Sequence, residues 1–232
     1  MNHTDAIARN WSALRARADA AARRVGRDPS SVRIVGAAKR QPPERVAAAV
    51  RAGLRDLGEN YLQEAVAMRS ALAAFLDASP DADVTWHAIG PLQRNKVRDA
   101  LGCFTWFHGI DSIALAAALA KRATREVNVL LQLNLSREAT KSGIEEAELP
   151  ALLDAARALP HLRVVGLMTM PAPAEDPELS RPCFARLRAL AERHGLAELS
   201  MGMSDDFEVA IEEGATLVRI GTALFGTRGD AA

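Results

Sequence analysis

The chain has 232 residues, of which 49% are apolar, as expected for a globular protein with a sizeable core. Lys plus Arg and Asp plus Glu both number 29, so no strong field of one sign would attract nucleic acid or an anionic membrane. This composition favours a small molecule as the partner.

The two cysteines, Cys103 and Cys183, lie far apart and show neither CxxC spacing nor a zinc-ligand pattern. We therefore expect a reduced, cytoplasmic protein without a metal site. Residues 1–11 lack the charged and apolar segments of a secretion signal, and no apolar run approaches the ~18 to 20 residues that span a bilayer. We expect neither secretion nor membrane insertion.

Taken in chain order, the sequence begins with an amphipathic helix at residues 4–25, which ends where Gly26 and Pro29 stop it. Short runs rich in β-forming residues then alternate with Ala- and Leu-rich segments of helical spacing, such as 43–53, 112–123 and 147–159. The predicted strands are 32–38, 54–58, 84–90, 104–110, 127–135, 162–170, 199–202 and 216–221.

Eight strands that alternate with helices, with no linker between them, predict one (β/α)₈ barrel over residues 1–232, preceded by the additional N-terminal helix. The competing fold is a doubly wound open sheet. Two of the strands, 54–58 and 199–202, are short, and residues 171–182 are expected to form a long surface loop.

In such a barrel, the loops that follow the strands build the active site, so polar residues at the strand ends form one set. This set contains Lys39, Glu59, Asn60, Tyr61, His87, Asn134, Ser136, Lys141, Ser200, Ser204, Arg219, Gly221 and Thr222, together with Met168 to Met170. We expect these residues to converge on one rim.

The last two loops predict a phosphate site. Barrels often hold a phosphate after strands seven and eight, where backbone N–H groups and small hydroxyls are available. Gly221 lets the main chain approach an anion, and Thr222 and Ser204 offer hydroxyls. Ser204 is also a good N-cap for the helix expected at 205–214, and capping alone is an equally common reason for a serine there.

Lysine is scarce in this chain: Lys39, Lys96, Lys121 and Lys141 are the only ones, and the other 25 of the 29 basic residues are arginines. A lysine at a strand end is usually a solvated or ion-paired cation. When it is partly desolvated near other cations, however, its amine can lose its proton and form a Schiff base with an aldehyde. An aldehyde that carries a phosphate would engage Lys39 and the last two loops together, and pyridoxal 5′-phosphate (PLP) is such a ligand.

The whole chain closely resembles the YggS-like family of pyridoxal phosphate homeostasis proteins. The strings that carry this resemblance are "AAKRQP", "LGENYLQEA", "WHAIGPLQRNK", "TKSGI", "VVGLMTM" and "LSMGMSDDFEVAIEEGATLVRIGTALFG". It implies the barrel of the N-terminal domain of alanine racemase, a monomer, and a role in regulating PLP or delivering it to PLP-dependent apoenzymes.

The resemblance also implies roles for individual residues. Lys39 would form the Schiff base, Arg219 would face the pyridine nitrogen, and the phosphate would be held by Ser204, Gly221 and Thr222. Asn60 and Lys141 would lie near the cofactor, and Met168 and Met201 would pack around its ring unless they are ordinary core residues. The family usually has Ser or Thr beside the lysine, whereas this chain has Ala37, Ala38, Arg40 and Gln41.

A carrier without robust catalysis is the preferred interpretation. Arginine opposite the pyridine nitrogen keeps its own proton, so the ring stays a weak electron sink. The alternative is a single-domain PLP-dependent amino-acid racemase that uses Lys39 with His87 or Tyr61 as its two bases. We expect Tyr61 instead to pack beside Asn60, and His87 to be a hydrogen-bonded interior residue. The same expectation applies to His108. A third interpretation is a phosphosugar enzyme with a catalytic lysine.

Overall fold

The computed structural model describes residues 3–76, 84–136 and 142–226. In it, eight parallel strands form a closed barrel in which each strand pairs with its neighbour in the chain. The strands are β1 (Arg33–Ala37), β2 (Asp56–Glu59), β3 (Thr85–Ala88), β4 (Trp106–Ile110), β5 (Val127–Leu133), β6 (Leu162–Thr169), β7 (Glu198–Ser200) and β8 (Leu217–Ile220). β1 also pairs with β8, with Ile34 opposite Val218. This confirms the predicted barrel and rules out the open sheet.

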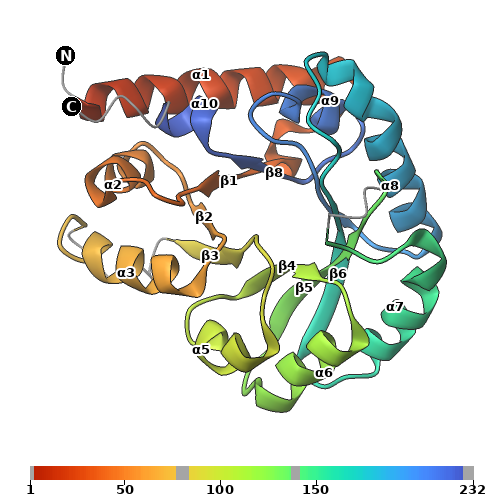
Figure 1. Cartoon of the computed structure of the whole chain (residues 1–232). Coiled ribbons are helices and arrows are strands. Elements are labelled where there is room, and N and C mark those ends of the chain that lie inside the picture. Colours follow the sequence, from red (N-terminus) through yellow and green to blue (C-terminus); the bar gives the residue numbers. More distant parts are fainter. Residues whose placement is uncertain (1–2, 77–83, 137–141, 227–232) are drawn as a thin grey trace.

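Helices surround the barrel (Figure 1). They are α2 (Pro43–Arg51), α3 (Leu62–Leu72), α5 (Val97–Leu101), α6 (Ile113–Arg122), α7 (Leu149–Arg157), α8 (Arg181–Arg193), α9 (Phe207–Glu212) and α10 (Thr222–Phe225). The short 3₁₀ helices are η1 (Pro29–Ser31), η2 (Arg94–Lys96), η3 (Glu146–Glu148) and η4 (Pro177–Ser180). The stretch 171–182, expected to be a loop, therefore contains η4 and the start of α8.

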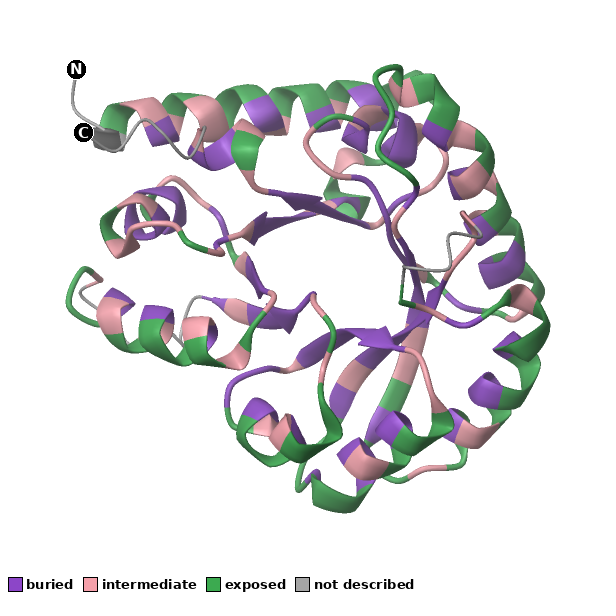
Figure 2. Ribbon diagram, in the orientation of Figure 1, coloured by how far each residue is buried: buried purple, intermediate pink, exposed green. Residues whose placement is uncertain are grey.

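The core has two parts. A large cluster fills the space between the strands and the helices, and Figure 2 shows the strands buried while the outer faces of the helices are exposed. A smaller cluster lies inside the barrel, as expected for strands whose side chains alternate between the two faces. Its buried members are Val35, Ile89, Trp106, Leu130, Met168 and Leu217.

The N-terminal helix, α1 (His3–Arg24), lies beside α10 and α9, across the place where the first and last parts of the barrel meet (Figure 1). Its buried side chains follow a helical spacing and include Ile7, Leu14, Ala18 and Ala21. Arg15 donates a hydrogen bond to the carbonyl of Val32, at 2.8 Å, and Asn10 donates one to the carbonyl of Leu224, at 3.1 Å. These bonds tie α1 to the chain just before β1 and just after β8.

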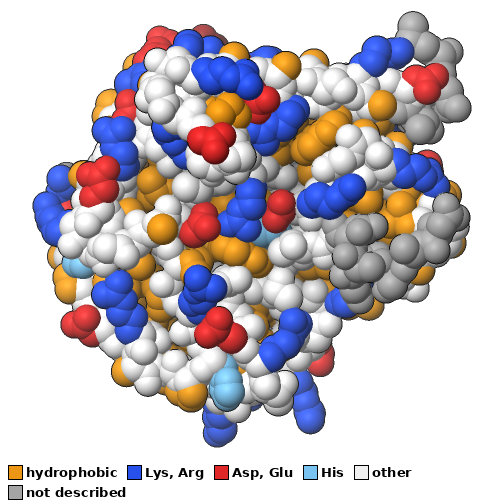
Figure 3. Space-filling view, turned by 180° about the vertical axis from the view of Figure 1, so that it is seen from behind, with side chains coloured by type: hydrophobic (Ala, Val, Ile, Leu, Met, Phe, Trp, Pro, Cys, Tyr) orange, Lys and Arg blue, Asp and Glu red, His pale blue; other side chains and the backbone are white. Residues whose placement is uncertain are grey.

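Acidic and basic side chains are interspersed on the face drawn in Figure 3, with no large area of a single sign. This distribution agrees with the balanced charge of the sequence. None of the described helices combines the length and the apolar character needed to traverse a bilayer.

Candidate functional site

The carboxyl ends of the strands all open on one rim, because every neighbouring pair in the barrel is parallel. Five of the predicted cofactor residues follow a strand end closely and therefore belong to this rim: Lys39, Asn60, Ser204, Gly221 and Thr222. Two others, Met168 and Arg219, lie within β6 and β8 and are buried. The eighth, Lys141, lies outside the described residues.

Lys39 lies in a tight turn after β1. The N–H of Ala38 donates to the carbonyl of Gly58 at 3.0 Å, and the N–H of Gln41 donates to the carbonyl of Ala38 at 2.9 Å. Arg40 adopts the left-handed conformation, with a φ of 58°, which few residues with a Cβ adopt. The turn is thus fixed to the neighbouring strand, and Lys39 is half-buried rather than fully solvated.

The end of β1 also touches the loop after β8. A Cβ built on Gly221 would lie 3.6 Å from the carbonyl oxygen of Ala37, which is ordinary van der Waals contact. The backbone that follows β8 therefore lies against the residue two positions before Lys39. Barrel closure brings together the two segments that were predicted to hold an amine and a phosphate site.

Ser204 connects the loops after β7 and β8. Its Oγ accepts a hydrogen bond from the N–H of Ala223, in α10, at 3.2 Å. The alternative role as N-cap of the following helix is wrong, because α9 begins at Phe207 and its N-cap position is Asp206, whose Oδ1 accepts from the N–H of Met203. Ser204 is therefore held beside the start of α10, next to Gly221 and Thr222.

Arg219 lies below this rim with its side chain buried. One guanidinium nitrogen, Nη1, donates to Ser200 Oγ at 2.6 Å, and the other, Nη2, donates to the carbonyl of Thr169 at 3.1 Å. Burial lowers the pKa of Arg219 to about 10, while the negative charge of Asp206 acts in the opposite direction. The guanidinium is therefore protonated at neutral pH, as expected for a residue that cannot take a proton from a ligand.

Glu59 was predicted to lie at the rim, but no role was predicted for it. It is the last residue of β2 and 1% exposed, and no hydrogen bond of ordinary geometry reaches either carboxylate oxygen. Burial and the negative charge of Glu64 raise the pKa of Glu59 to about 8, against the effects of the backbone N–H of Asn60 and of the positive charge of Lys39. A protonated carboxylic acid thus lies within the electrostatic reach of Lys39 at neutral pH. An acidic residue at the end of a buried strand was the signal that could have indicated it.

Two loops at the rim pack backbone against backbone. A Cβ on Gly90 would lie 2.6 Å from the carbonyl oxygen of Asn60, closer than real Cβ atoms approach. Glycine is therefore required after β3 to let the chain pass Asn60, which itself is half-buried. This contact fixes the backbone of Asn60 at the rim.

The two methionines have different surroundings. Met168 belongs to the cluster inside the barrel, below the rim, where a ring could lie against it. Met201 belongs to the large cluster between the strands and the helices. The expectation that Met201 packs around a ligand ring is therefore wrong, and it is an ordinary core residue.

The candidate acid–base residues other than Lys39 differ in their exposure. Both ring nitrogens of His87 are engaged inside the barrel, with Asp56 Oδ1 and with His108, each at 2.9 Å. This confirms the interpretation of His87 as an interior residue. Tyr61, expected to pack, is instead 56% exposed, because it precedes α3, whose buried positions begin further along, at Ala65.

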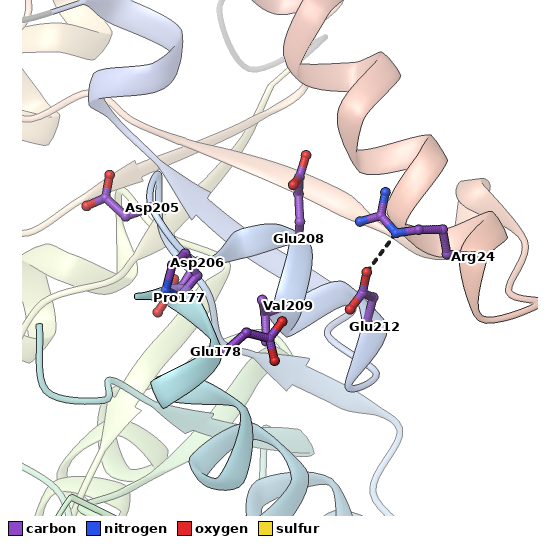
Figure 4. A pocket seen from close by; sticks show the side chains of 8 residues that line it. All are labelled: Arg24, Pro177, Glu178, Asp205, Asp206, Glu208, Val209 and Glu212. Carbon is purple, nitrogen blue, oxygen red and sulfur yellow. Dashed lines mark hydrogen bonds and ion pairs between the residues drawn. The ribbon is translucent and has the colours of Figure 1, made fainter. Parts of the chain in front are cut away.

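A pocket of about 240 Å³ lies on the surface near α1, η4 and α9 (Figure 4). Carboxylates dominate its lining, which consists of Arg24, Pro177, Glu178, Asp205, Asp206, Glu208, Val209 and Glu212, and Arg24 is paired with Glu212 at 2.7 Å. Such a lining would repel a phosphate. Among the described residues, no cluster of His, Cys, Asp and Glu is arranged to hold a metal ion.

Comparison with known proteins identifies the family. A family model described as "Alanine racemase, N-terminal domain" matches residues 3–229. A pyridoxal phosphate homeostasis protein of Pseudomonas aeruginosa is 46% identical over 227 residues, which are 96% of each chain. The chain belongs to the pyridoxal phosphate homeostasis protein family. A second member, from Escherichia coli K12, is 41% identical over 230 residues, or 96% of this chain and 97% of the relative.

Solved structures agree with this assignment. The structure of PipY from Synechococcus elongatus with PLP bound is 34% identical, with a TM-score of 0.80, and covers 95% of this chain and 100% of its own. Alanine racemase from Corynebacterium glutamicum is 24% identical, with a TM-score of 0.70, over 95% of this chain and 60% of its own. The latter likeness supports the barrel fold alone.

Replacing Glu59 by Gln should remove a pH-dependent loss of stability. Because the pKa of Glu59 is about 8 in the folded protein and 4.5 ordinarily, the folded state keeps this proton between these values while the unfolded state releases it. Wild type therefore loses stability as the pH rises through this window. We expect the difference in free energy of unfolding between Glu59→Gln and wild type to shift in favour of the variant by up to about 4 kcal/mol as the pH rises from 4.5 to 8.5. Urea denaturation at each pH measures this difference.

Glu64→Gln is the matched control. It removes the charge that helps to raise the pKa of Glu59, so it should weaken the pH dependence without abolishing it. A constant difference between Glu59→Gln and wild type at all pH values would contradict the assignment.

Proposed function

We propose that the protein binds PLP reversibly and takes part in intracellular PLP homeostasis. The observation that carries this proposal is the contact between Gly221 and Ala37, which joins the loop that carries Lys39 to the loop that follows β8. PLP has an aldehyde and a phosphate, so one molecule would engage both loops. Relatives named for PLP homeostasis, and a structural neighbour with PLP bound, support the choice of ligand.

Lys39 is proposed as the residue that bonds to the cofactor. When PLP is bound, its aldehyde supplies a group that condenses with a primary amine. Lys39 offers this amine from a half-buried turn near the buried acid Glu59. Its position above the interior cluster that contains Met168 would allow a planar ring to lie against apolar side chains.

The phosphate is assigned to Ser204, Gly221 and Thr222. Gly221 has a φ of −109°, which any residue can adopt, and a Cβ there would meet only ordinary contacts. Neither the backbone nor the packing within the protein requires glycine, which fits a position kept open for an anion. Thr222 is exposed, and the hydroxyl of Ser204 is fixed by the N–H of Ala223.

The remaining assignments follow the family resemblance. Arg219 would face the pyridine nitrogen, and Asn60 and Lys141 would lie near the cofactor. Because Arg219 keeps its proton at neutral pH, it would donate a hydrogen bond to the nitrogen and leave the ring a weak electron sink.

We also propose that the protein holds and delivers PLP to apoenzymes as a cytoplasmic monomer, without robust catalysis. Racemisation needs a second acid–base residue opposite the lysine. His87 and His108 are fully buried and hydrogen-bonded to each other, which makes them poor candidates for contact with an amino acid. Tyr61 is exposed after β2 and is the second base that the racemase alternative would use. The relatives are likewise named for homeostasis rather than for a reaction.

The covalent assignment predicts the behaviour of Lys39→Ala. Purified wild type supplied with PLP should show a visible absorbance band, and borohydride should fix PLP to the peptide that contains Lys39. Lys39→Ala and the charge-preserving Lys39→Arg should both lack the fixed adduct, because neither side chain condenses with an aldehyde. Lys121→Ala, at an exposed position of α6, is the control. An adduct on another lysine would overturn the assignment.

The phosphate assignment predicts a difference between two serines. Ser204 Oγ accepts from Ala223 N–H at 3.2 Å, and Ser112 Oγ accepts from Leu115 N–H at 3.3 Å at the start of α6. Replacing either by Ala should cost about 1 kcal/mol of stability. Only Ser204→Ala should also weaken PLP binding, by roughly tenfold, as measured by fluorescence titration. Equal affinities for both variants would remove Ser204 from the phosphate site.

The carrier proposal predicts that solvent deuterium does not enter the Cα position of free amino acids at an enzymatic rate. Wild type loaded with PLP would be incubated with L-alanine and other amino acids in D₂O and followed by proton NMR. Free PLP at the same concentration provides the background rate. Exchange that is rapid in wild type and absent in Lys39→Ala would establish an enzyme and refute the carrier role.

A further inference from the structure

A continuous line of hydrogen-bonded side chains crosses the interior of the barrel. Arg219 Nη1 lies 2.6 Å from Ser200 Oγ, which lies 2.8 Å from His108 Nδ1. His108 Nε2 lies 2.9 Å from His87 Nδ1, and His87 Nε2 lies 2.9 Å from Asp56 Oδ1. The members come from β8, β7, β4, β3 and β2. We call these five residues the interior line.

The two ends of the interior line determine the direction of all its hydrogen bonds. Arginine can only donate, and an ionised aspartate can only accept. The Nε2–H of a neutral His87 must therefore donate to Asp56, which leaves His87 Nδ1 to accept from His108 Nε2–H. His108 Nδ1 then accepts from the Ser200 hydroxyl, which itself accepts from Arg219. With neutral imidazoles, this is the arrangement that satisfies all four contacts.

The surroundings keep both imidazoles neutral. Burial lowers the pKa of His87, against the hydrogen bond and charge of Asp56. Burial also places the pKa of His108 well below its ordinary value, and a protonated His87 and the charge of Arg219 act in the same direction. Neither ring is therefore expected to take up a proton at neutral pH.

Other charged groups face the two ends of the line. Arg33 lies 3.9 Å from Asp56 and 3.1 Å from Glu198, and its guanidinium stacks over Trp106 at 4.3 Å. The charge of Asp206 acts on Arg219 at the other end. Arg33, Asp56 and Glu198 each begin their strands, so this end of the line lies at the face of the barrel opposite the rim.

We propose that Ser200, His108, His87 and Asp56 are positioning residues that orient Arg219 toward the cofactor ring. The proposal rests on the proposed function, because it concerns the residue assigned to the pyridine nitrogen. One N–H of Arg219 is committed to Ser200 and another to the Thr169 carbonyl, so the guanidinium plane is fixed and its remaining donors have a defined direction.

The line also couples the far face to Arg219. If His87 gained a proton, it would donate to both Asp56 and His108, and the proton of His108 would be on Nδ1. The Ser200 hydroxyl could then no longer donate to His108. A change at Asp56 would therefore alter the polarity next to Arg219 without any contact between Asp56 and the ligand.

The first test needs no cofactor. Nitrogen-15 NMR of the histidine side chains should show His87 and His108 as neutral Nε2–H tautomers from pH 6 to 8. Asp56→Asn should change the ring nitrogen shifts of His108 as well as those of His87. An Nδ1–H tautomer, ordinary titration near pH 6.5, or His108 shifts unaffected in Asp56→Asn would each overturn the proposal.

The second test uses bound PLP. Ser200→Ala should weaken PLP binding about tenfold and shift the pH midpoint of the visible absorbance of the complex, because Arg219 is no longer held. Asp56→Asn should shift this midpoint in the same direction, and it tests the line independently if Ser200→Ala does not fold. Ser180→Ala, at a buried serine of η4, is the matched control.

The outcomes separate this inference from the proposed function. If wild type does not bind PLP, the proposed function fails, and with it the role of the line toward a cofactor. If wild type binds PLP and both Ser200→Ala and Asp56→Asn keep wild-type affinity and absorbance midpoint, the proposed function survives and the positioning role is wrong.

Discussion

The pairing of β1 with β8 is the constraint on which the candidate site depends. It closes the barrel and places the turn that holds Lys39 against the loop that holds Gly221, although Lys39 and Gly221 lie far apart in the sequence. α1 reinforces this closure, because its bonds to Val32 and Leu224 lie on both sides of the join. A site that needs an amine from the first loop and an anion cradle from the last exists only while this join is intact.

Burial moves the pKa values of two interior groups toward the neutral form. It lowers the pKa of Arg219 to about 10, against the charge of Asp206, so the guanidinium still keeps its proton at neutral pH and donates to Ser200 and the Thr169 carbonyl. Burial and the charge of Glu64 raise the pKa of Glu59 to about 8, so the neutral acid predominates at neutral pH. Both side chains are almost fully buried, so their charges differ because arginine has a far higher ordinary pKa than glutamic acid.

The eight strands were predictable because each is a short apolar run bounded by turn residues, and even the short β2 and β7 are present. The rim positions of Lys39, Asn60, Ser204, Gly221 and Thr222 followed from the parallel order alone. The hydrogen-bond partner of Ser204 could not be predicted in this way. A serine before a helix can cap that helix or bond to another loop, and the packing of α10 determines which of the two occurs. The burial of Met201 outside the barrel and the exposure of Tyr61 depended in the same way on strand alternation and on where a helix begins. The interior line could not be predicted, because its contacts depend on the register of five strands, and no local sequence pattern specifies that register.

In the proposed carrier, Lys39 at the rim and Arg219 below the cofactor ring would have separate roles. The rim would hold the ligand through a bond that water can reverse, whereas Arg219 would keep the ring from withdrawing electrons strongly. The second effect requires the guanidinium to stay in one orientation, and a lone buried arginine with several torsions has no reason to do so. The interior line would hold the guanidinium in one orientation. Asp56, the acceptor at the opposite face, sets the direction of the hydrogen bonds along the line, and each donor in between already has its acceptor.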